Sequence, residues 1–262
     1  PQSKVLVIAS DIAKYGIGTP GEPTQGAGSV AMLISQNPRI LAFNDDNVAQ
    51  TRDVMDFWRP NYTTTPFVNG IYSTQQYLDS LKTTWVEYQK RTGLALTDFA
   101  AVCFHLPYPK LALKGLKKIL DKSLSEDQKA QLQYNFDQSI LYSQRIGNIY
   151  TASLFLGLLS LLENQPQLKA GDRIALFSYG SGAVAEIFSA NLVAGYEQML
   201  DSKRMEKLDQ RTVLSVDDYE RLFYEEVDLD PSGNQVFEPA THQTYALTEI
   251  KEHQRIYQKV EK

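Results

Sequence analysis

The sequence contains one cysteine, Cys103, no apolar run long enough to cross a membrane, and no excess of positive charge. A single cysteine excludes a disulfide framework and a cysteine-rich metal site, and it favours a reducing compartment, so we expect a cytoplasmic protein. The longest apolar run, 149–162, is shorter than the ~20 residues of a membrane span and predicts a buried helix. The formal charge of −5 argues against attraction to nucleic acid or to an anionic membrane surface through a global field.

With 43% hydrophobic and 22% charged residues, the composition is that of a globular chain with one large core or two smaller ones. Continuous apolar runs at 4–10 and 99–106 predict strands that are buried on both faces, as in parallel α/β sheets. Further strands are expected at 29–35, 173–179, 183–192 and 245–250, and helices at 73–92, 109–120, 125–142 and 148–163. The segment 44–70 is expected to be a long irregular connection. This alternation of strands and helices predicts an α/β layered domain with helices on both faces of the sheet.

Local signals mark the ends of two of these helices. Ser73 with Gln76, and Ser125 with Gln128, have the spacing of a capping box, in which two side chains bond the free N–H groups of a helix start. Gly93 is expected to end the helix that begins at Ser73.

The glycine-rich loop 16–21 matches the letters of the dinucleotide-binding fingerprint and follows a predicted strand. That fingerprint needs a helix directly after its glycines, because the pyrophosphate binds at the helix N-terminus. Pro20 and Pro23, followed by Gly26 and Gly28, are incompatible with such a helix, so binding of a nicotinamide or flavin cofactor is not expected.

The acidic segment 228–239 begins like a calcium-binding loop, with glycine at the sixth position of the motif. The twelfth position is Pro239, where the motif requires a bidentate glutamate. We interpret the segment as a solvated acidic turn and expect no metal site.

Gly180, Ser181 and Gly182 resemble part of a nucleophile elbow, but Ser178 takes the place of the first glycine of that motif. A nucleophilic role for Ser181 is therefore not expected. Glycines let the backbone approach a substrate closely, so this turn is a candidate source of N–H donors for a developing negative charge.

His105 is the residue that physical arguments favour most as part of a site. It ends an apolar strand and precedes a proline-rich turn, and in α/β sheets sites form at the carboxyl ends of strands. A core histidine that is satisfied by backbone groups is the alternative. Cys103 points to the same face of the strand, which would allow a Cys/His nucleophile pair. Most buried cysteines are simply small apolar residues, and we expect this of Cys103.

Lysines follow His105 closely, in a chain that is acidic overall: Lys110, Lys114, Lys117, Lys118 and Lys122. The first four have helical spacing and are expected on one face of a helix. Such a face is usually solvated, but beside a candidate site it also suits a polyanionic ligand such as a nucleotide phosphate.

The string 104–110, Phe-His-Leu-Pro-Tyr-Pro-Lys, resembles the histidine motif of the 3-hydroxy-3-methylglutaryl-CoA (HMG-CoA) synthase family, in its bacterial form. Other segments are similar to motifs of the same family and occur in the same order: 11–15, 22–28, 56–60, 147–153 and 177–182. The resemblance is firm as far as about Leu192 and looser beyond it.

The resemblance implies a thiolase-like fold, in which two similar halves form α-β-α-β-α layers, and a homodimer. Residues 1–43 would be the end of the N-terminal half, and 44–262 the C-terminal half with insertions. The implied reaction condenses acetyl-CoA with acetoacetyl-CoA and water to HMG-CoA and CoA, in the mevalonate pathway, with no cofactor beyond these CoA thioesters.

The resemblance also implies roles for individual residues. His105 would be catalytic and would polarise or protonate the ketone of the acetoacetyl group. Asn148 would orient the acyl chain, while Gly180 and Ser181 would supply a backbone donor. Other implied residues are Lys110 and Lys114, which would hold the CoA phosphate, and Tyr15, Thr24, Asp11 and Asp56, which would line or support the pocket.

The cysteine nucleophile and glutamate base of the family have no counterpart in this sequence, and Cys103 does not match the nucleophile motif. We therefore expect the chain to be the C-terminal portion of such an enzyme, inactive and poorly soluble without the N-terminal portion that would cover its apolar faces. A condensing enzyme similar to ketoacyl synthase III and a non-catalytic acyl-CoA-binding half-fold are the alternatives.

Overall fold

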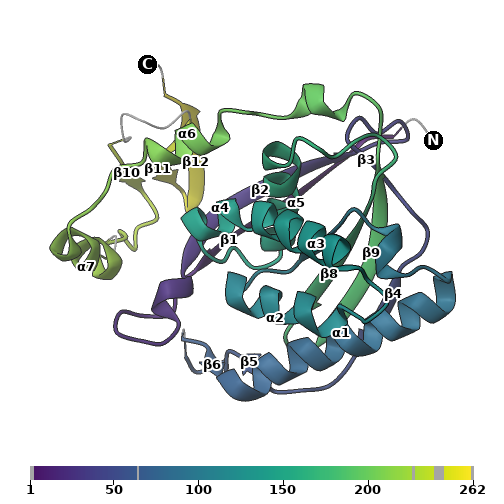
Figure 1. Ribbon diagram of the computed structural model, residues 1–262. Coiled ribbons are helices and arrows are strands. Elements are labelled where there is room, and N and C mark those ends of the chain that lie inside the picture. The colour runs from purple at the N-terminus through teal and green to yellow at the C-terminus, as the bar shows by residue number, and fades with distance from the viewer. Residues whose placement is uncertain (1–2, 64, 226–227, 239–244, 261–262) are drawn as a thin grey trace. The chain divides into compact units, whose positions relative to one another are not determined.

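The computed structural model describes residues 3–63, 65–225, 228–238 and 245–260 (Figure 1). The chain divides into two compact units, Pro1–Arg211 and Thr212–Lys262. The boundary expected between residues 43 and 44 concerns the two halves of a thiolase-like fold and stays a prediction.

The first unit contains a two-stranded ribbon, a five-stranded sheet, a small hairpin and six α-helices among the described residues. The ribbon is β1 (Val5–Ala13) and β2 (Gly26–Ile34), and the hairpin is β5 (Phe57–Trp58) and β6 (Phe67–Val68). The sheet consists of β3 (Leu41–Phe43), β4 (Val48–Thr51), β7 (Ala101–Phe104), β8 (Arg173–Gly180) and β9 (Val184–Leu192). The helices are α1 (Gly70–Thr92), α2 (Pro109–Ile119), α3 (Glu126–Ser139), α4 (Leu141–Ile146), α5 (Ala152–Asn164) and α6 (Arg204–Asp209).

The sheet has the strand order β3-β9-β8-β7, and β4 also pairs with β9. Only β7 and β8 are parallel, with Cys103 opposite Leu176, and the other pairs are antiparallel, so the sheet is mixed. Because β7 and β8 are parallel neighbours, their carboxyl ends lie side by side at the same end of the sheet. His105 follows the first of these ends, and Gly180 lies at the second.

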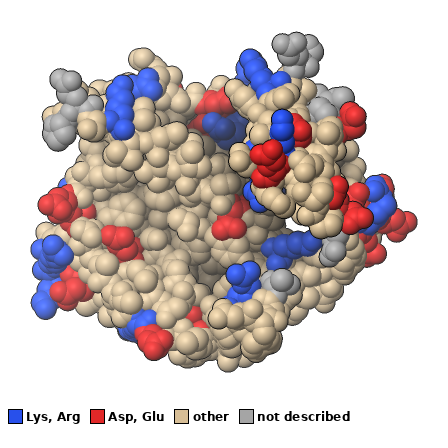
Figure 2. All heavy atoms as spheres, turned by 180° about the vertical axis from the view of Figure 1, so that it is seen from behind, with Lys and Arg blue, Asp and Glu red and all other residues tan. Residues whose placement is uncertain are grey.

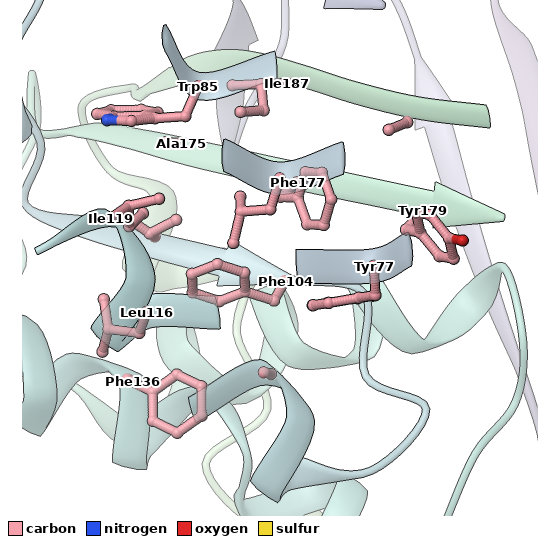
Figure 3. Packing of buried hydrophobic residues seen from close by; sticks show 14 of the residues in the cluster. Tyr77, Trp85, Phe104, Leu116, Ile119, Phe136, Ala175, Phe177, Tyr179 and Ile187 are labelled. Carbon is pink, nitrogen blue, oxygen red and sulfur yellow. The ribbon is translucent and has the colours of Figure 1, made fainter. Parts of the chain in front are cut away.

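Helices cover both faces of this sheet, as the sequence predicts (Figure 1). Val102 and Phe104 of β7 face a core formed with α1, α2 and α3, and Figure 3 shows Phe104 among the rings and aliphatic side chains of that core. Ala101 and Cys103 point to the opposite face and pack against α5. All four residues of β7 are buried, which confirms the expected buried strand.

The ribbon corrects one prediction. The run 4–10 was expected to be buried on both faces, and it does form β1, but its outer face is exposed: Leu6 by 60% and Ile8 by 59%. The inner face is only partly covered: Ala9 and Val30 pack against the residues that begin α5, whereas Val5 and Val7 on the same face are 55% and 41% exposed. The exposure of Leu6 and Ile8 shows that no other described element covers the outer face, and β1 pairs only with β2 among the described residues.

Helix ends follow the sequence signals in part. The capping box of Ser125 and Gln128 is present, and Gly93 ends α1 with φ of +74°. The predicted start at Ser73 is wrong, because Asn69 caps α1 and accepts a bond from the Tyr72 N–H (3.1 Å). Ser73 lies inside the helix, where its hydroxyl bonds a buried carboxylate.

Three other boundaries differ from the expected ones. The helix expected at 125–142 is divided into α3 and α4, and the helix expected at 148–163 begins only at Ala152. The segment 44–70 is not wholly irregular, since β4 pairs with β9 and β5 pairs with β6.

The second unit contains α7 (Val216–Tyr224) and a three-stranded sheet of β10 (Gln235–Val236), β11 (Tyr245–Lys251) and β12 (Gln254–Lys259). The strand expected at 245–250 is thus confirmed as β11. In the acidic segment, the Ser232 N–H donates to Asp230 Oδ1 (2.8 Å), which closes a local turn; Pro239 lies outside the described residues. Among all helices described, none is both long and apolar enough to span a bilayer.

Candidate functional site

His105 lies at the edge where β7 ends, and its backbone is held on two sides. Its N–H donates to the Phe177 carbonyl (2.7 Å), and the Tyr77 hydroxyl donates to its carbonyl oxygen (3.0 Å). Neither ring nitrogen has a hydrogen-bond partner within the described part of the chain, so backbone groups satisfy the main chain of His105 and not its ring. Burial lowers the pKa of this imidazole to about 4. At neutral pH the ring is therefore uncharged, with one N–H donor and one acceptor nitrogen.

Asn148 is buried in the connection between α4 and α5, and its carboxamide is oriented by three bonds. Its Oδ1 accepts from the Tyr150 N–H (2.9 Å) and from the Ser153 hydroxyl (3.1 Å), while its Nδ2 donates to the Tyr15 hydroxyl (3.1 Å). A carboxamide has two N–H donors. Across the residues that the structure describes, only one of the two is used, so the second is available to a ligand.

Gln25 connects the Tyr15 loop to this site, and sequence reasoning missed it. Its Oε1 accepts from the backbone N–H groups of Tyr15 (2.7 Å) and Gly16 (3.1 Å). The neighbouring Thr24 carbonyl accepts from the Asn148 N–H (3.0 Å). The structure thus brings the predicted residues Tyr15, Thr24 and Asn148 together, with Gln25 as the residue that fixes the loop.

The approach of the two segments is close enough to require glycine. A Cβ atom on Gly147 would lie 1.9 Å from the Gln25 carbonyl oxygen, and one on Gly26 would lie 2.5 Å from the Ile146 carbonyl oxygen. Gly147 also has a φ of +87°, which side chains rarely adopt. These two glycines therefore allow Thr24 to reach the backbone of Asn148.

Three aromatic rings, including that of Tyr15, form a cluster next to Asn148. The ring centroids of Tyr15, Phe57 and Tyr150 are 6.2–6.5 Å apart in every pair. Burial, the Tyr15 hydroxyl and the charge of Asp11 raise the pKa of Tyr150 well above its usual range. Asp11 itself is exposed on the ribbon, and its Oδ1 accepts from the N–H of Ile12 (2.8 Å). Its influence on Tyr150 is thus electrostatic.

Asp56 is completely buried and holds the turn between β8 and β9. Its Oδ2 accepts from the hydroxyls of Tyr179 (3.0 Å) and Ser73 (3.1 Å), and its Oδ1 accepts from the Gly182 N–H (3.1 Å). The N–H of Gly182 is therefore occupied. Asp56 thus fixes the conformation of this turn. A role of Asp56 in lining the pocket stays a prediction.

Gly180 and Ser181 lie exposed in that turn. The turn joins two antiparallel strands, and the peptide bond between Gly182 and Ala183 is cis. A nucleophile elbow joins a strand to a helix, so the rejection of that motif is confirmed.

The dinucleotide fingerprint at residues 16–21 was also correctly rejected, because a short 3₁₀ turn (Glu22–Thr24) and β2 follow this loop in place of a helix.

A cavity of about 320 Å³ adjoins these residues. Leu106, next to His105, and Gly147, next to Asn148, both line it, as do Tyr108 and Pro109, which directly precede Lys110. Its other lining residues are Pro23, Thr24, Gln25, Pro107, Ser143, Gln144, Arg145 and Ile146. The volume lies at the lower end of the ~300–1,000 Å³ range of small-molecule sites.

Lys110 and Lys114 are exposed on α2, with Lys117 and Lys118 on the same side. The opposite face of this helix, which includes Leu111 and Leu116, is buried. The structure therefore confirms the common exposed face of the lysines, and it leaves the binding of phosphate as a prediction. On the face shown in Figure 2, basic and acidic side chains are interspersed, so a site for an anion is a local feature.

Cys103 is fully buried against α5, and burial raises the pKa of its thiol to about 12. A thiol of this kind is a poor nucleophile. The expectation that Cys103 is a small apolar residue of the core is confirmed. No group of three or more His, Cys, Asp and Glu side chains that could hold a metal ion occurs among the residues described.

Comparison with known proteins identifies the family. Residues 47–135 and 116–260 match the family described as "Hydroxymethylglutaryl-coenzyme A synthase C terminal". The hydroxymethylglutaryl-CoA synthase of Enterococcus faecalis is 51% identical over 232 residues, which cover 88% of this chain and 60% of that protein. The polyketide 3-hydroxy-3-methylglutaryl-ACP synthase PksG of Bacillus subtilis is 33% identical and is covered over 57% of its length. The chain therefore spans somewhat less than two thirds of these relatives.

Solved structures agree with the sequence comparisons. An HMG-CoA synthase complexed with CoA is 66% identical, with a TM-score of 0.94 over 98% of this chain and 66% of that one. MvaS in complex with 3-hydroxy-3-methylglutaryl coenzyme A is 33% identical, with a TM-score of 0.79. The mixed sheet with helices on both faces is thus the thiolase-like fold of these enzymes, as predicted. The chain belongs to the hydroxymethylglutaryl-CoA synthase family.

Proposed function

We propose that this chain supplies the acetoacetyl-CoA side of an HMG-CoA synthase site, in which acetyl-CoA, acetoacetyl-CoA and water give HMG-CoA and CoA. The observation that carries the proposal is the unbonded ring of His105 and the spare N–H of Asn148, whose neighbours Leu106 and Gly147 line one cavity. The similarity to an HMG-CoA synthase complexed with CoA supports the choice of substrate.

His105 is the residue to which we assign polarisation of the ketone. In the reaction, a carbanion derived from the acetyl group attacks the ketone carbon of the acetoacetyl group, and the ketone oxygen becomes a hydroxyl. A neutral imidazole donates its N–H to this oxygen as a hydrogen bond and so stabilises the negative charge that develops there.

Asn148 orients the same acyl chain through its spare N–H, because its other three polar positions are already bonded. Tyr15 and Thr24 act through Asn148, the first by its hydroxyl and the second by its carbonyl. Asp56 fixes the turn from which Gly180 and Ser181 present backbone N–H groups to the thioester oxygen.

The cavity is the part of the site to which we assign the pantetheine arm of the CoA thioester. Pro109, which precedes the exposed Lys110, and Leu106, which follows His105, both line it, and we assign the CoA phosphate to Lys110 and Lys114. The pantetheine arm joins the phosphate end of CoA to the acyl group, and it therefore occupies the cavity between these residues.

The rest of the proposal follows the family. The nucleophile and the base come from an N-terminal portion that covers the exposed outer face of the β1–β2 ribbon, and the complete enzyme is a homodimer. It acts in the mevalonate pathway in the cytoplasm, which suits a chain with one buried cysteine. The CoA thioesters are substrates, and no further cofactor takes part.

An assay of free CoA released from acetyl-CoA plus acetoacetyl-CoA tests the proposal in the complete gene product. His105→Ala is expected to lower the rate at least 100-fold, the usual size of a lost hydrogen-bond donor to a developing oxyanion. His253→Ala is the matched control, because His253 lies in the second unit, at the β11–β12 turn, and its loss should leave the rate within twofold.

Each alternative predicts a different result in the same assay. Turnover with an acyl carrier protein substrate but none with acetoacetyl-CoA would indicate a ketoacyl synthase-like or HMG-ACP synthase-like enzyme. Absence of turnover together with CoA binding would indicate a non-catalytic acyl-CoA-binding protein. An unchanged rate in His105→Ala would return His105 to a structural role.

A further inference from the structure

Ser143 has a buried hydroxyl without a partner. The residue is 5% exposed, and its Oγ is the one buried side-chain oxygen or nitrogen, among those of the described residues, that lacks a hydrogen bond. A serine inside a helix usually donates to the carbonyl one turn earlier, and Ser143 on α4 does not. Leaving such a group unpaired destabilises a folded protein, so its presence calls for an explanation.

The position of Ser143 supplies that explanation. The residue lines the 320 Å³ cavity together with its neighbour Gln144, whereas the adjacent Tyr142 points to the other side of α4 and donates its hydroxyl to Glu163. A serine hydroxyl can turn about the Cα–Cβ bond between staggered positions, so the oxygen can be directed at a molecule in the cavity. The rest of the lining combines apolar residues, including Pro23 and Leu106, with polar ones such as Thr24 and Gln144.

We propose that the Ser143 hydroxyl binds an amide group of the pantetheine arm of the CoA thioester in this cavity. The inference rests on the proposed function, from which the path of the arm is taken. The arm is an apolar chain interrupted by two amides, and an amide offers both a carbonyl acceptor and an N–H donor. A hydroxyl can answer either group. Ser143 is thus a binding residue for the arm, separate from the residues that we assign to the phosphate and the acyl group.

The substitution Ser143→Ala separates binding from stability, because the two should change in opposite directions. Removal of an unpaired buried hydroxyl raises the thermal midpoint of the free protein, by about 2–4 °C for a chain of this size. The same substitution weakens binding of CoA about 3- to 10-fold, the effect of one lost hydrogen bond. Adenosine 3′,5′-bisphosphate, which is CoA without the pantetheine arm and one phosphate, should bind the variant and the wild type equally.

Ser139→Ala is the matched control. Ser139 is 2% exposed and lies on the preceding helix, but its hydroxyl is satisfied by the Phe136 carbonyl (2.7 Å). Its removal should lower the thermal midpoint and leave the ratio of the two ligand affinities unchanged.

Isothermal titration of the complete gene product with CoA and with the bisphosphate, together with thermal unfolding, decides the matter. A Ser143→Ala variant that binds CoA as the wild type does, or that loses both ligands equally, overturns the proposal. So does a wild-type protein for which CoA and the bisphosphate bind equally well, since the arm then adds nothing. In that case the condensation reaction, which the His105→Ala assay tests independently, can still stand.

Discussion

Strands β1 and β7 come from similar apolar runs, yet they differ in how far their side chains are buried. All four residues of β7 are buried, with helices on both sides of the sheet. In β1 the outer face is open, and Ile12 there is 70% exposed. A continuous apolar run therefore predicts a strand, but it does not show that the described chain covers both faces of that strand.

The exposure of β1 indicates a role for the β1–β2 ribbon. Part of its inner face packs against the first turn of α5, and Asp11 and Thr24, which belong to the candidate site, both lie near the end where its two strands are joined. The outer face has the composition of a core strand and the exposure of a surface. In the proposed enzyme this face is the contact with the N-terminal portion, so the ribbon is where the site is completed.

The largest expected effect comes from a pair of matched substitutions, one in each region. Ile187→Ala on β9 removes a side chain that is 2% exposed and should cost about 2–5 kcal/mol of unfolding free energy. Ile8→Ala removes the same atoms from a side chain that is 59% exposed and should cost less than about 1 kcal/mol. Urea unfolding of both variants measures the contrast. Equal losses would mean that the ribbon is covered in solution, for example by a second copy of the chain.

The joint between ribbon and sheet should be the next most sensitive place. Gly147→Ala places a Cβ 1.9 Å from the Gln25 carbonyl oxygen and should cost about 2–4 kcal/mol, from the clash and the positive φ together. Gly171→Ala separates the two causes, because Gly171 has nearly the same φ (+89°) and open space around it. It should cost about 1 kcal/mol, measured by the same unfolding experiment. Similar losses in the two variants would show that the close approach is not formed.

The sequence predicts the sheet better than it predicts the site. Buried strands and capping boxes are local signals, so β7, β8 and the start of α3 could be recognised directly. Ser73 shows the limit of such signals: its spacing fits a cap, but a carboxylate 17 residues earlier in the chain takes its hydroxyl.

The roles of Gln25 and Ser143 depend on which segments meet, and spacing along the chain carries no information about this. Tyr77 could be recognised as a core residue from its place four residues before Leu81, but not as the donor to His105. The family resemblance supplied Asn148 and Tyr15, whose direct contact emerged only in three dimensions.

A pH-dependent effect should distinguish the end of β7 from the ribbon. His105 has a folded-state pKa lowered from 6.5 to about 4, so the unfolded chain binds a proton more readily. The stabilisation that this shift contributes is complete above pH 6.5 and is lost as the pH falls towards 4, by roughly 2–3 kcal/mol. His105→Gln should therefore lose less stability than the wild type over this interval, whereas Ile8→Ala should follow the wild-type curve. Parallel curves for His105→Gln and the wild type would contradict the lowered pKa.

The smallest effect on stability is expected on the outer face of the ribbon itself. Leu6 and Leu33 are directly opposite each other there, and both are more than half exposed. Replacing both by threonine places a β-branched strand former at each position, so the unfolding free energy of the chain should change by less than about 0.5 kcal/mol. Solubility should rise, because an apolar patch is removed. In the complete gene product the same double substitution should instead lower stability by several kcal/mol, since both side chains are then part of a core. A chain whose solubility is unchanged, or a complete protein that tolerates the substitutions, would remove the ribbon from the proposed contact.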